Sequence, residues 1–516
     1  MKKLQRRGWF RYLTLGSIAC LMAIAFAFGA VTAQETPRVF KVATEPTFPP
    51  FEMQAQGGQG LEGFDIDLME AIAAEAGLEV EFVSLPFDGI IPALQSQTVD
   101  AAISGITITA ERAQSLSFSR PYFKAGLAIA VQENENNIRS FDDLKGKKIA
   151  VQIGTTGARE AAKIEGAKIV TFDSAAIALQ ELINGKVDAV VNDGPVTLYA
   201  IKNAGLKGVK VVGELVTEEF YGIALPKDSP DLEKINGALE NLLATGEYNA
   251  IYQNWFAGEP PPLPPVAPAL ESDAVNALNW GRLFQNLFKG AGVTLMLTFF
   301  SFIFGLLGGT LVALALISPY KPLRLICRVY VEFFRGTPML VQLFMIYFGL
   351  PALFRELGLD FSFERLPAAI AALSLNVAAY LAEIMRGGIQ SIEKGQWEAC
   401  ESLGMNPIET MRYIIFPQAF RRMLPPLGNE FITLIKDTSL VAVIGFEELF
   451  RQGQLMVATT YKAFEIYLAV ALVYLLLTTA SSFIFKWLER RMDPLKKKTK
   501  AVAPPKNITR PQVASQ

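Results

Sequence analysis

Long apolar runs occur in only one part of this chain. Residues 35–257 alternate short apolar stretches with polar ones, whereas residues 290–488 contain runs long enough to cross a lipid bilayer. A transmembrane helix needs about 20 mostly apolar residues. The pattern predicts five spans, at about 290–317, 339–350 with its flanks, 366–385, 424–445 and 466–487.

The charges between the predicted spans indicate their orientation. Basic residues follow the first, third and fifth spans, including Lys321, Arg324 and Arg328, then Arg386, Lys394, Arg412, Arg421 and Arg422, then Arg490 and Arg491. The two other loops, near 356–364 and 447–448, are acidic or mixed. Because Lys and Arg gather on the cytoplasmic side of a membrane, we expect residues before the first span outside and the C-terminus in the cytoplasm.

The region 38–257 has the pattern of a soluble α/β domain. Apolar runs predict strands at 39–43, 80–83, 101–104, 149–151 and 189–191, and helical periodicity marks 66–76 and 90–97. The segments 98–105 and 186–193 repeat one pattern, in which Val-Asp-Ala opens a strand that ends in polar residues. This repeat predicts two similar lobes, each offering ligands at the carboxyl end of a strand. The expected fold is therefore an α/β two-lobed domain followed by an all-α five-helix transmembrane domain.

Two segments flank the soluble region. Basic residues near the N-terminus and an apolar run from Leu13 to Ala30 precede a small-residue site at Ala33, which is typical of a signal peptide over 1–33. An uncleaved anchor helix is the alternative. The stretch 258–280 begins with six prolines between Gly258 and Pro268, which favours a stiff, extended linker. We assign 284–490 to the transmembrane domain and 491–516 to a basic cytoplasmic tail.

Composition excludes several classes of function. The 516 residues include no histidine, so His-dependent catalytic triads and zinc sites are excluded, and we expect neither metal nor cofactor. No G-x-x-x-x-G-K-[ST] motif occurs, so any ATP hydrolysis needs a partner protein. The net charge of −2 gives no indication of nucleic-acid binding. Cys20, Cys327 and Cys400 all lie outside the soluble region, which therefore has no disulfide framework.

Polar residues at predicted strand ends suit an α-amino acid. Such a ligand needs a cation for its carboxylate, a carboxylate for its ammonium and neutral donors around them. Arg112 and Asp193 meet the first two needs. The neutral groups would come from Ser104, Gly105 and Thr107 in the first lobe and from Gly154, Thr155, Thr156 and Asn192 in the second. The alternative for Arg112 is a surface ion pair.

Five strings in this region resemble the bacterial polar-amino-acid binding proteins, close to the glutamine-binding type. They are ATEPTFPPFE (43–52), GFDID (63–67), FDGIIPALQ (87–95), SGITITAER (104–112) and FSRPYF (118–123). The resemblance implies that Phe48 and Phe87 sandwich the aliphatic stem of the ligand. It also implies that Gly105, Thr107 and Arg112 hold the carboxylate and amine, and that Asp193 takes the ammonium. Ordinary core packing remains the alternative for the aromatic pair.

Three positions depart from the glutamine-binding pattern. Glu45 replaces an Asp, Gln152 replaces a Lys and Asn192 replaces a His. Since Arg112 and Asp193 balance the two ends of a zwitterion, Glu45 is a surplus carboxylate with no lysine to offset it. A buried unpaired carboxylate is costly, and a cationic ligand side chain would relieve that cost. We therefore expect Arg, Lys or His as ligand, with Gln tolerated and Glu rejected, unless Glu45 lies at the rim and bonds within its own lobe.

A polar segment, Glu398–Pro417, lies between two apolar regions. It reads as Glu-Ala-small, three residues, Gly, nine residues, then I-x-F-P. Residues 398–403 favour a helix, Gly404 allows an abrupt turn, and Asn406-Pro407 suits a new helix start. The segment resembles the coupling-helix motif of permease subunits of ATP-binding-cassette importers. That resemblance implies that Glu398, Ala399, Gly404 and Pro417 belong to a docking surface for a separate ATPase. An ordinary connecting loop is the alternative.

The membrane half carries further strings that resemble polar-amino-acid permeases. They include FFRGTPMLVQ (333–342), FPQAFRRMLPPLGNEF (416–431) and LIKDTSL (434–440). The resemblance implies a homodimeric permease in the bacterial inner membrane, surrounded by lipid. Polar residues in or beside the spans either line a translocation site or bind helices together: Asn376, Glu383, Asn429, Glu430, Lys436 and Asp437.

Together these features predict a fused receptor and permease for ATP-driven uptake of an amino acid. One alternative has the same architecture with specificity for glutamine or glutamate. Another is an amino-acid-gated ion channel, but the soluble domain runs uninterrupted to Trp255 and no TVGYG-like filter occurs. An enzyme such as a dehydratase lacks a metal or histidine constellation here. A receptor that signals through a kinase would leave the segment 398–417 unexplained.

Overall fold

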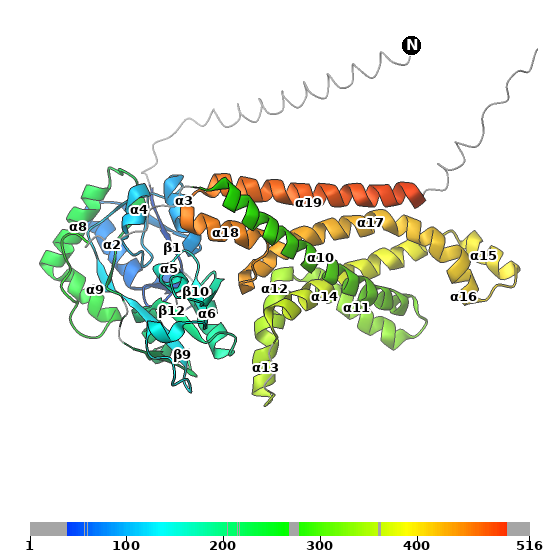
Figure 1. Cartoon of the computed structure of the whole chain (residues 1–516), viewed down its shortest axis with the longest axis horizontal. Coiled ribbons are helices and arrows are strands. Elements are labelled where there is room, and N and C mark those ends of the chain that lie inside the picture. The colour runs from blue at the N-terminus through cyan, green and yellow to red at the C-terminus, as the bar shows by residue number, and fades with distance from the viewer. Residues whose placement is uncertain are drawn as a thin grey trace, which may run out of the picture.

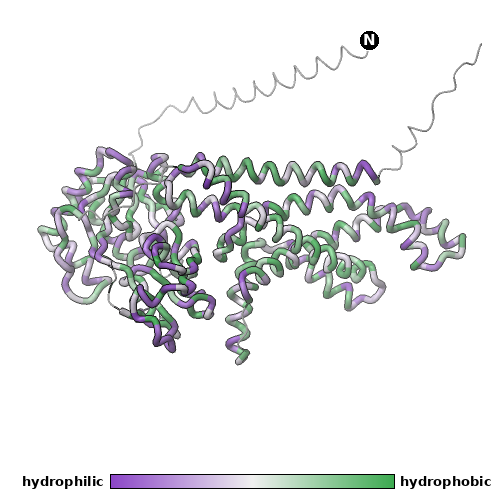
Figure 2. The backbone as a smooth tube through the Cα atoms, in the orientation of Figure 1, coloured by the Kyte–Doolittle hydropathy of each residue, from purple (hydrophilic) through white to green (hydrophobic). Residues whose placement is uncertain are grey.

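The computed structural model describes residues 39–492 except 56, 59, 204, 214, 216, 268–277 and 360–362. The predicted signal peptide, part of the linker and most of the basic tail therefore lie outside the described residues. Figure 1 shows an α/β domain of two lobes at one end and a bundle of long helices extending away from it. Hydrophobic residues dominate the middle of the bundle helices, while the α/β domain alternates hydrophobic and hydrophilic segments (Figure 2).

Lobe one is built on a five-stranded sheet with the order β5-β1-β6-β15-β7. The strands are β1 (Val39–Thr44), β5 (Glu79–Ser84), β6 (Ala101–Ala102), β7 (Leu116–Phe118) and β15 (Ala224–Pro226). A small sheet adds β2 (Thr47–Phe48), β3 (Glu52–Gln54) and β4 (Leu61–Glu62). The helices are α2 (Phe64–Ala76), α3 (Phe87–Gln95), α4 (Ala110–Ser115), α8 (Leu232–Thr245) and α9 (Glu247–Trp255). Aromatic rings fill the core, where Phe51 and Phe64 are fully buried.

Lobe two repeats this arrangement with the order β11-β10-β12-β9-β13. Its strands are β9 (Leu127–Gln132), β10 (Lys148–Gln152), β11 (Lys168–Phe172), β12 (Ala189–Asp193) and β13 (Val209–Val212). Its helices are α5 (Thr156–Ala162), α6 (Ala175–Ile183), α7 (Gly194–Lys202) and a 3₁₀ turn, Phe141–Leu144. The two segments of the sequence repeat become β6 and β12, which pair in parallel with β1 and β10. The predicted two-lobed α/β fold is confirmed.

Two short strands join the lobes. β8 (Phe123–Ala125) leads from lobe one into lobe two, and β14 (Glu219–Tyr221) leads back. They pair antiparallel, with Glu219 opposite Ala125 and Tyr221 opposite Phe123. The lobes can therefore change their relative angle only through this two-stranded hinge, and residues on it lie between the lobes.

The bundle contains long helices with shorter ones between them. The elements are α10 (Trp280–Ile317), α11 (Lys321–Gly336), α12 (Met339–Phe344), a π-helical segment Met345–Gly349, α13 (Leu350–Glu356), α14 (Arg365–Gln390), α15 (Lys394–Ser402), α16 (Pro407–Glu409), a π-helical segment Thr410–Ile415, α17 (Phe416–Asp437), a 3₁₀ segment Thr438–Ile444, α18 (Leu449–Thr460) and α19 (Ala463–Met492). Small residues allow α10 and α14 to cross closely, because a Cβ on Gly309 would lie 2.9 Å from the Ala378 carbonyl oxygen.

The predicted count of five spans is not confirmed. Within the described residues, four helical segments are long and apolar enough to cross a membrane, at Trp280–Ile317, Met339–Glu356, Arg365–Gln390 and Ala463–Met492. The predicted fourth span falls on α17 and the 3₁₀ segment after it. Their sequence includes Glu430, Lys436 and Asp437, which lower the hydropathy below that of a bilayer helix. α17 is still part of the bundle core, where Ala419, Met423, Leu427 and Leu434 are buried.

The α/β domain rests directly on one end of the bundle. Linker residues 258–267 contain no helix or strand, and Leu263 packs against the core of lobe one, while the last residue of the predicted linker, Trp280, begins α10. Lobe two contacts the π-helical segment and α13: Tyr347 donates a hydrogen bond to Glu181 (2.8 Å), and Arg355 donates one to Asn184 (3.0 Å). α15 and α16 lie at the opposite end of the bundle (Figure 1).

Candidate ligand-binding site

Nine of the thirteen residues predicted to form the binding site line one small pocket between the lobes. They are Phe48, Phe87, Gly105, Thr107, Arg112, Gln152, Thr155, Thr156 and Asp193. The free volume is only about 10 Å³, so the lobes are closed upon one another. Of the other four, Glu45, Ser104 and Asn192 are buried beside the pocket without lining it, and Gly154 lines a larger adjoining cavity.

Arg112 spans the cleft between the lobes. The hydroxyl of Thr109 caps the start of α4 and so positions this side chain, which is only 3% exposed. Its guanidinium donates to the carbonyl oxygens of Thr107 in lobe one (2.8 Å) and Gly154 in lobe two (3.0 Å). It also lies 5.6 Å from the centroid of the Phe87 ring. The surface ion-pair interpretation of Arg112 is therefore wrong, because the group is buried and faces the cleft.

Asp193 closes the opposite side of the pocket. It ends β12, is buried, and its Oδ1 has no hydrogen-bond partner. Burial, together with repulsion from Glu219, raises the pKa of Asp193 to about 7. An unpaired buried carboxylate oxygen is unfavourable, and a ligand ammonium would satisfy it. Arg112 and Asp193 thus place a positive and a negative charge beside the same small pocket.

Gly105 has a conformation and a contact that only glycine permits. Its φ is +53°, and an added Cβ would lie 2.8 Å from Cε1 of Phe48. Its backbone N–H donates to Asp65 (2.9 Å), so this donor is not free for a ligand, contrary to the expectation for the turn that follows β6. Gly105 therefore shapes the pocket by letting the Phe48 ring approach the backbone.

Sequence reasoning missed Glu219, the carboxylate at the hinge. It is 2% exposed and accepts hydrogen bonds from Thr107 of lobe one (2.7 Å) and Thr156 of lobe two (2.8 Å). Both threonines line the pocket, so Glu219 orients their hydroxyl groups when the lobes are closed. The one sequence signal is an acidic residue directly before the apolar run Phe220–Leu225.

Glu45 is buried rather than at the rim. Its carboxylate accepts from Thr47 in its own lobe (2.7 Å) and from Nε2 of Gln152 in lobe two (2.6 Å). Burial raises the pKa of Glu45 to about 7, although both hydrogen bonds oppose that rise. Oε1 of Gln152 has no partner. Glu45 therefore acts on the pocket from behind Gln152.

Ser104 and Asn192 bond away from the pocket. Ser104 donates to Glu52 (2.6 Å) and accepts from the N–H of Glu45 (3.1 Å). Asn192 donates to Thr197 in its own lobe (3.3 Å). Both residues therefore support neighbouring groups in this closed structure.

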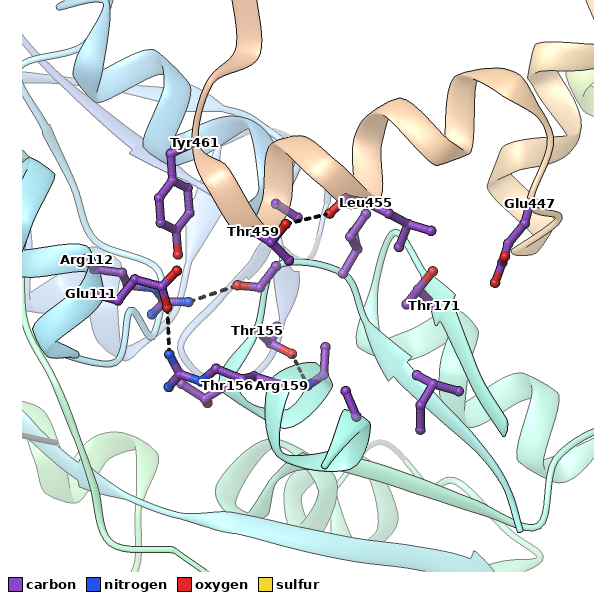
Figure 3. A pocket seen from close by; sticks show the side chains of 16 residues that line it. Glu111, Arg112, Thr155, Thr156, Arg159, Thr171, Glu447, Leu455, Thr459 and Tyr461 are labelled. Carbon is purple, nitrogen blue, oxygen red and sulfur yellow. Dashed lines mark hydrogen bonds and ion pairs between the residues drawn. The ribbon is translucent and has the colours of Figure 1, made fainter. Parts of the chain in front are cut away.

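A second, larger cavity lies between the α/β domain and α18, with a volume of about 440 Å³. It shares Arg112, Thr155 and Thr156 with the small pocket. In Figure 3, Leu455, Thr459 and Tyr461 face these residues from the helical half of the chain. The cavity wall also holds an ion pair in which Arg159 lies 2.9 Å from Glu111. The small pocket therefore adjoins a chamber bounded by both halves of the chain.

The segment 398–417 has the local structure that its sequence predicts. Glu398 and Ala399 lie on α15, and Gly404 follows it with φ +73°. Asn406 begins the next helix through reciprocal hydrogen bonds with Glu409 (2.9 and 3.0 Å), and Pro417 lies in the first turn of α17. Large apolar side chains are exposed at this tip, where Leu403 is 80% and Ile408 is 78% exposed.

Of the polar residues predicted in or beside the spans, two have clear partners. Asn376 donates to Oε1 of Gln342 (2.8 Å), and Gln342 in turn donates to the carbonyl of Thr337 (3.0 Å). Glu383 pairs with Arg386 one turn away on its own helix, at 2.6 Å. For Asn376, the structure favours the interpretation that the residue joins helices.

Comparison with known proteins assigns each half of the chain. Residues 40–258 match the model of bacterial extracellular solute-binding proteins, family 3. Residues 305–494 match that of the binding-protein-dependent transport system inner membrane component.

Relatives are found for both halves. The glutamine transport system permease protein GlnP of Escherichia coli K12 is 46% identical over 209 residues, covering 40% of this chain and 94% of GlnP. The L-cystine transport system permease protein TcyB of Bacillus subtilis is 41% identical over 222 residues, covering 42% of this chain and 92% of TcyB. A protein named probable histidine-binding protein, from Neisseria gonorrhoeae, is 38% identical over 236 residues, covering 45% of this chain and 87% of that protein.

These relatives are transport proteins rather than enzymes, and the two halves that they match are joined here in one polypeptide. The chain belongs to the amino-acid ATP-binding-cassette importers, as a family 3 solute-binding domain fused to an inner-membrane permease domain.

Proposed function

We propose that the chain binds a basic amino acid, or glutamine, between its two lobes and delivers it to its own permease half. The observation that carries this proposal is the closed pocket in which buried Arg112 and Asp193 face the same space and Oδ1 of Asp193 has no partner. A ligand carboxylate would replace the carbonyls of Thr107 and Gly154 as the acceptor for the Arg112 guanidinium, and the ligand ammonium would donate to Oδ1 of Asp193.

The choice of ligand side chain depends on the end of the pocket near Gln152. Oε1 of Gln152 can accept a hydrogen bond, and Glu45 lies directly behind it. A guanidinium or ammonium there would be attracted by Glu45, and a glutamine amide could donate to Gln152 without any charge. A glutamate side chain would meet like charge. The relatives named for glutamine and histidine are compatible with both ligand types.

Delivery would use the cavity of about 440 Å³ beside the pocket. When the lobes open at the hinge, Arg112, Thr155 and Thr156 would separate, and the ligand would enter space bounded by α18. We place the solute-binding domain outside the inner membrane and α15 in the cytoplasm. In this arrangement α17 is the fifth crossing, since it packs within the bundle between the two ends.

A separate ATPase would supply the energy, docking on the exposed apolar tip at Leu403 and Ile408 beside α15. Two copies of the chain would form the permease, as the predicted homodimer requires.

The described residues include no group of three or more His, Cys, Asp or Glu side chains that could hold a metal ion.

The first test is calorimetric titration of the purified full chain with arginine, lysine, histidine, glutamine and glutamate. We expect binding of the basic amino acids or glutamine, and none of glutamate. The same titration of Arg112→Met should show weakened binding. Arg159→Met is its matched control, because Arg159 lines the larger cavity and not the small pocket. Binding of glutamine alone would identify a glutamine importer. The absence of binding for all five would overturn the proposed ligand class.

A further inference from the structure

Arg451 is a fully buried arginine that the permease half inserts into the solute-binding domain. It lies on α18, and its side chain is 0% exposed. Its guanidinium pairs with the carboxylate of Asp173 and donates to the carbonyl of Thr171 (2.6 Å) in lobe two. Gln454, one turn along α18, accepts a further hydrogen bond at 3.1 Å. The contact is specific because two donors of one guanidinium bind two groups of the same lobe.

Asp173 contacts Gln152, which lines the ligand pocket. Its backbone carbonyl accepts from Nε2 of Gln152 at 3.2 Å, and the same Nε2 donates to Glu45 in lobe one at 2.6 Å. A continuous set of polar contacts therefore runs from the permease through lobe two to lobe one. It exists only while the lobes are closed, since the Gln152–Glu45 bond joins the two lobes.

Asp88 of lobe one is a second carboxylate close to Asp173 and Arg451. It lies in the first turn of α3, against which α18 packs, and a Cβ on Gly154 of lobe two would lie 3.7 Å from the Cα of Asp88. Burial raises the pKa of Asp88, repulsion from Asp173 raises it further, and Arg451 lowers it. Asp88 and Asp173 therefore repel each other across the mouth of the cleft, and Arg451 attracts both.

Closing the cleft without this cation would bring two half-buried carboxylates from opposite lobes together. Repulsion between like charges grows as water is excluded, so it would favour the open domain. We propose that Arg451 is a positioning residue through which the permease raises the ligand affinity of the docked domain, by neutralising Asp88 and Asp173 in the closed state. This inference rests on the proposed function, because it assumes that an amino acid occupies the cleft.

The coupling runs in both directions. If Arg451 stabilises the closed domain on the permease, a bound ligand strengthens docking by the same factor. Movement of α18 during transport would then withdraw the cation and favour opening at the mouth of the cleft. The ligand would be released where Arg112, Thr155 and Thr156 border the cavity against α18.

The test compares two arginines of the same interface in the full chain. Arg451→Met removes the cation at the cleft. Arg355→Met is the matched control because Arg355 is exposed and, among the described residues, its side chain bonds only to Asn184 at the edge of lobe two. Equilibrium binding of radiolabelled arginine and glutamine gives Kd for each variant, and thermal unfolding shows that each is folded. We expect Kd to rise about ten-fold in Arg451→Met, or about 1.4 kcal/mol, and less than about two-fold in Arg355→Met.

A second substitution distinguishes lost charge balance from lost packing. Asp88→Asn removes the repulsion, so the double variant Asp88→Asn/Arg451→Met should regain most of the wild-type affinity. An unchanged Kd in Arg451→Met, an equal loss in Arg355→Met, or no recovery in the double variant would each overturn the inference. These outcomes differ from failure of the proposed function, in which the wild-type chain itself binds no amino acid.

Discussion

The ligand pocket and the segment 398–417 lie at opposite ends of the molecule and are built in different ways. The pocket takes residues from both lobes that are spread between Phe48 and Asp193, and buried hydrogen bonds hold Thr107 and Arg112 in place. The segment 398–417 is continuous in sequence, held by helix caps, and exposes Leu403 and Ile408. This difference agrees with the proposed function, in which one end encloses a small molecule and the other docks a partner protein.

The largest expected effect is on ligand binding at the pocket. Arg112→Met should raise Kd for the ligand by at least about 100-fold, because two charge-assisted hydrogen bonds are worth about 1.5–3 kcal/mol each. Calorimetry on the full chain measures this change, with Arg159→Met as control. A Kd within a few-fold of wild type would show that Arg112 only bridges the lobes.

At the other end, a substitution should reduce transport strongly without changing ligand binding. Gly404→Val places a β-branched residue at φ +73°, where it is strained, so the turn after α15 should be distorted. We expect uptake in proteoliposomes with the partner ATPase to fall about 30-fold, the loss expected when about 2 kcal/mol of docking contact is removed. Gly395→Val within α15, where the added Cβ meets open space, is the control. A matching rise in Kd would contradict the separation of the two ends.

Acid should weaken ligand binding at the pocket. Asp193 must be ionised to hold the ligand ammonium, and its pKa of about 7 in the ligand-free chain means that affinity is full above pH 7 and falls as pH drops below it. Between pH 8 and pH 6 the Kd for glutamine should rise about ten-fold, as expected for one such group. Arginine should weaken more steeply, because Glu45 has a raised pKa of about 7 as well. Parallel slopes for the two ligands would exclude Glu45 from ligand recognition.

A smaller effect tests Glu45 directly. Glu45→Gln removes its charge and keeps hydrogen-bonding capacity towards Thr47 and Gln152. We expect Kd for arginine to rise about five-fold, the equivalent of about 1 kcal/mol of screened attraction, with no change for glutamine. Competition binding on one preparation measures both ligands. Equal effects on the two would contradict an electrostatic role.

The smallest effect is expected at Asn192. Its side chain donates to Thr197 and not to the pocket, so Asn192→Ala should change Kd by less than about two-fold for either ligand. Titration with arginine and glutamine checks this. A change of ten-fold or more would mean that Asn192 turns to the ligand when the cleft is occupied.

Local rules were sufficient where neighbours in sequence are neighbours in space. Gly404, Asn406 and Pro407 predict a turn and a helix start because each acts on its own backbone, and the structure has both. The repeated Val-Asp-Ala pattern predicts two equivalent strands because both follow the same helix-to-strand transition. Hydropathy alone did not decide whether α17 is a span. Its buried face is apolar, but its sequence also carries Glu430, Lys436 and Asp437.

The sequence by itself determined the two halves, their order and the residue types that an amino acid requires, because apolar periodicity and charge act along the chain. Only the tertiary structure decided that Glu219 orients two threonines, that the Gly105 amide is already bonded, and that Glu45 lies behind Gln152. It also brought Arg451 against Asp173, although 277 residues separate them. Such contacts depend on how the lobes close and where the permease docks, and no local pattern of residues records either.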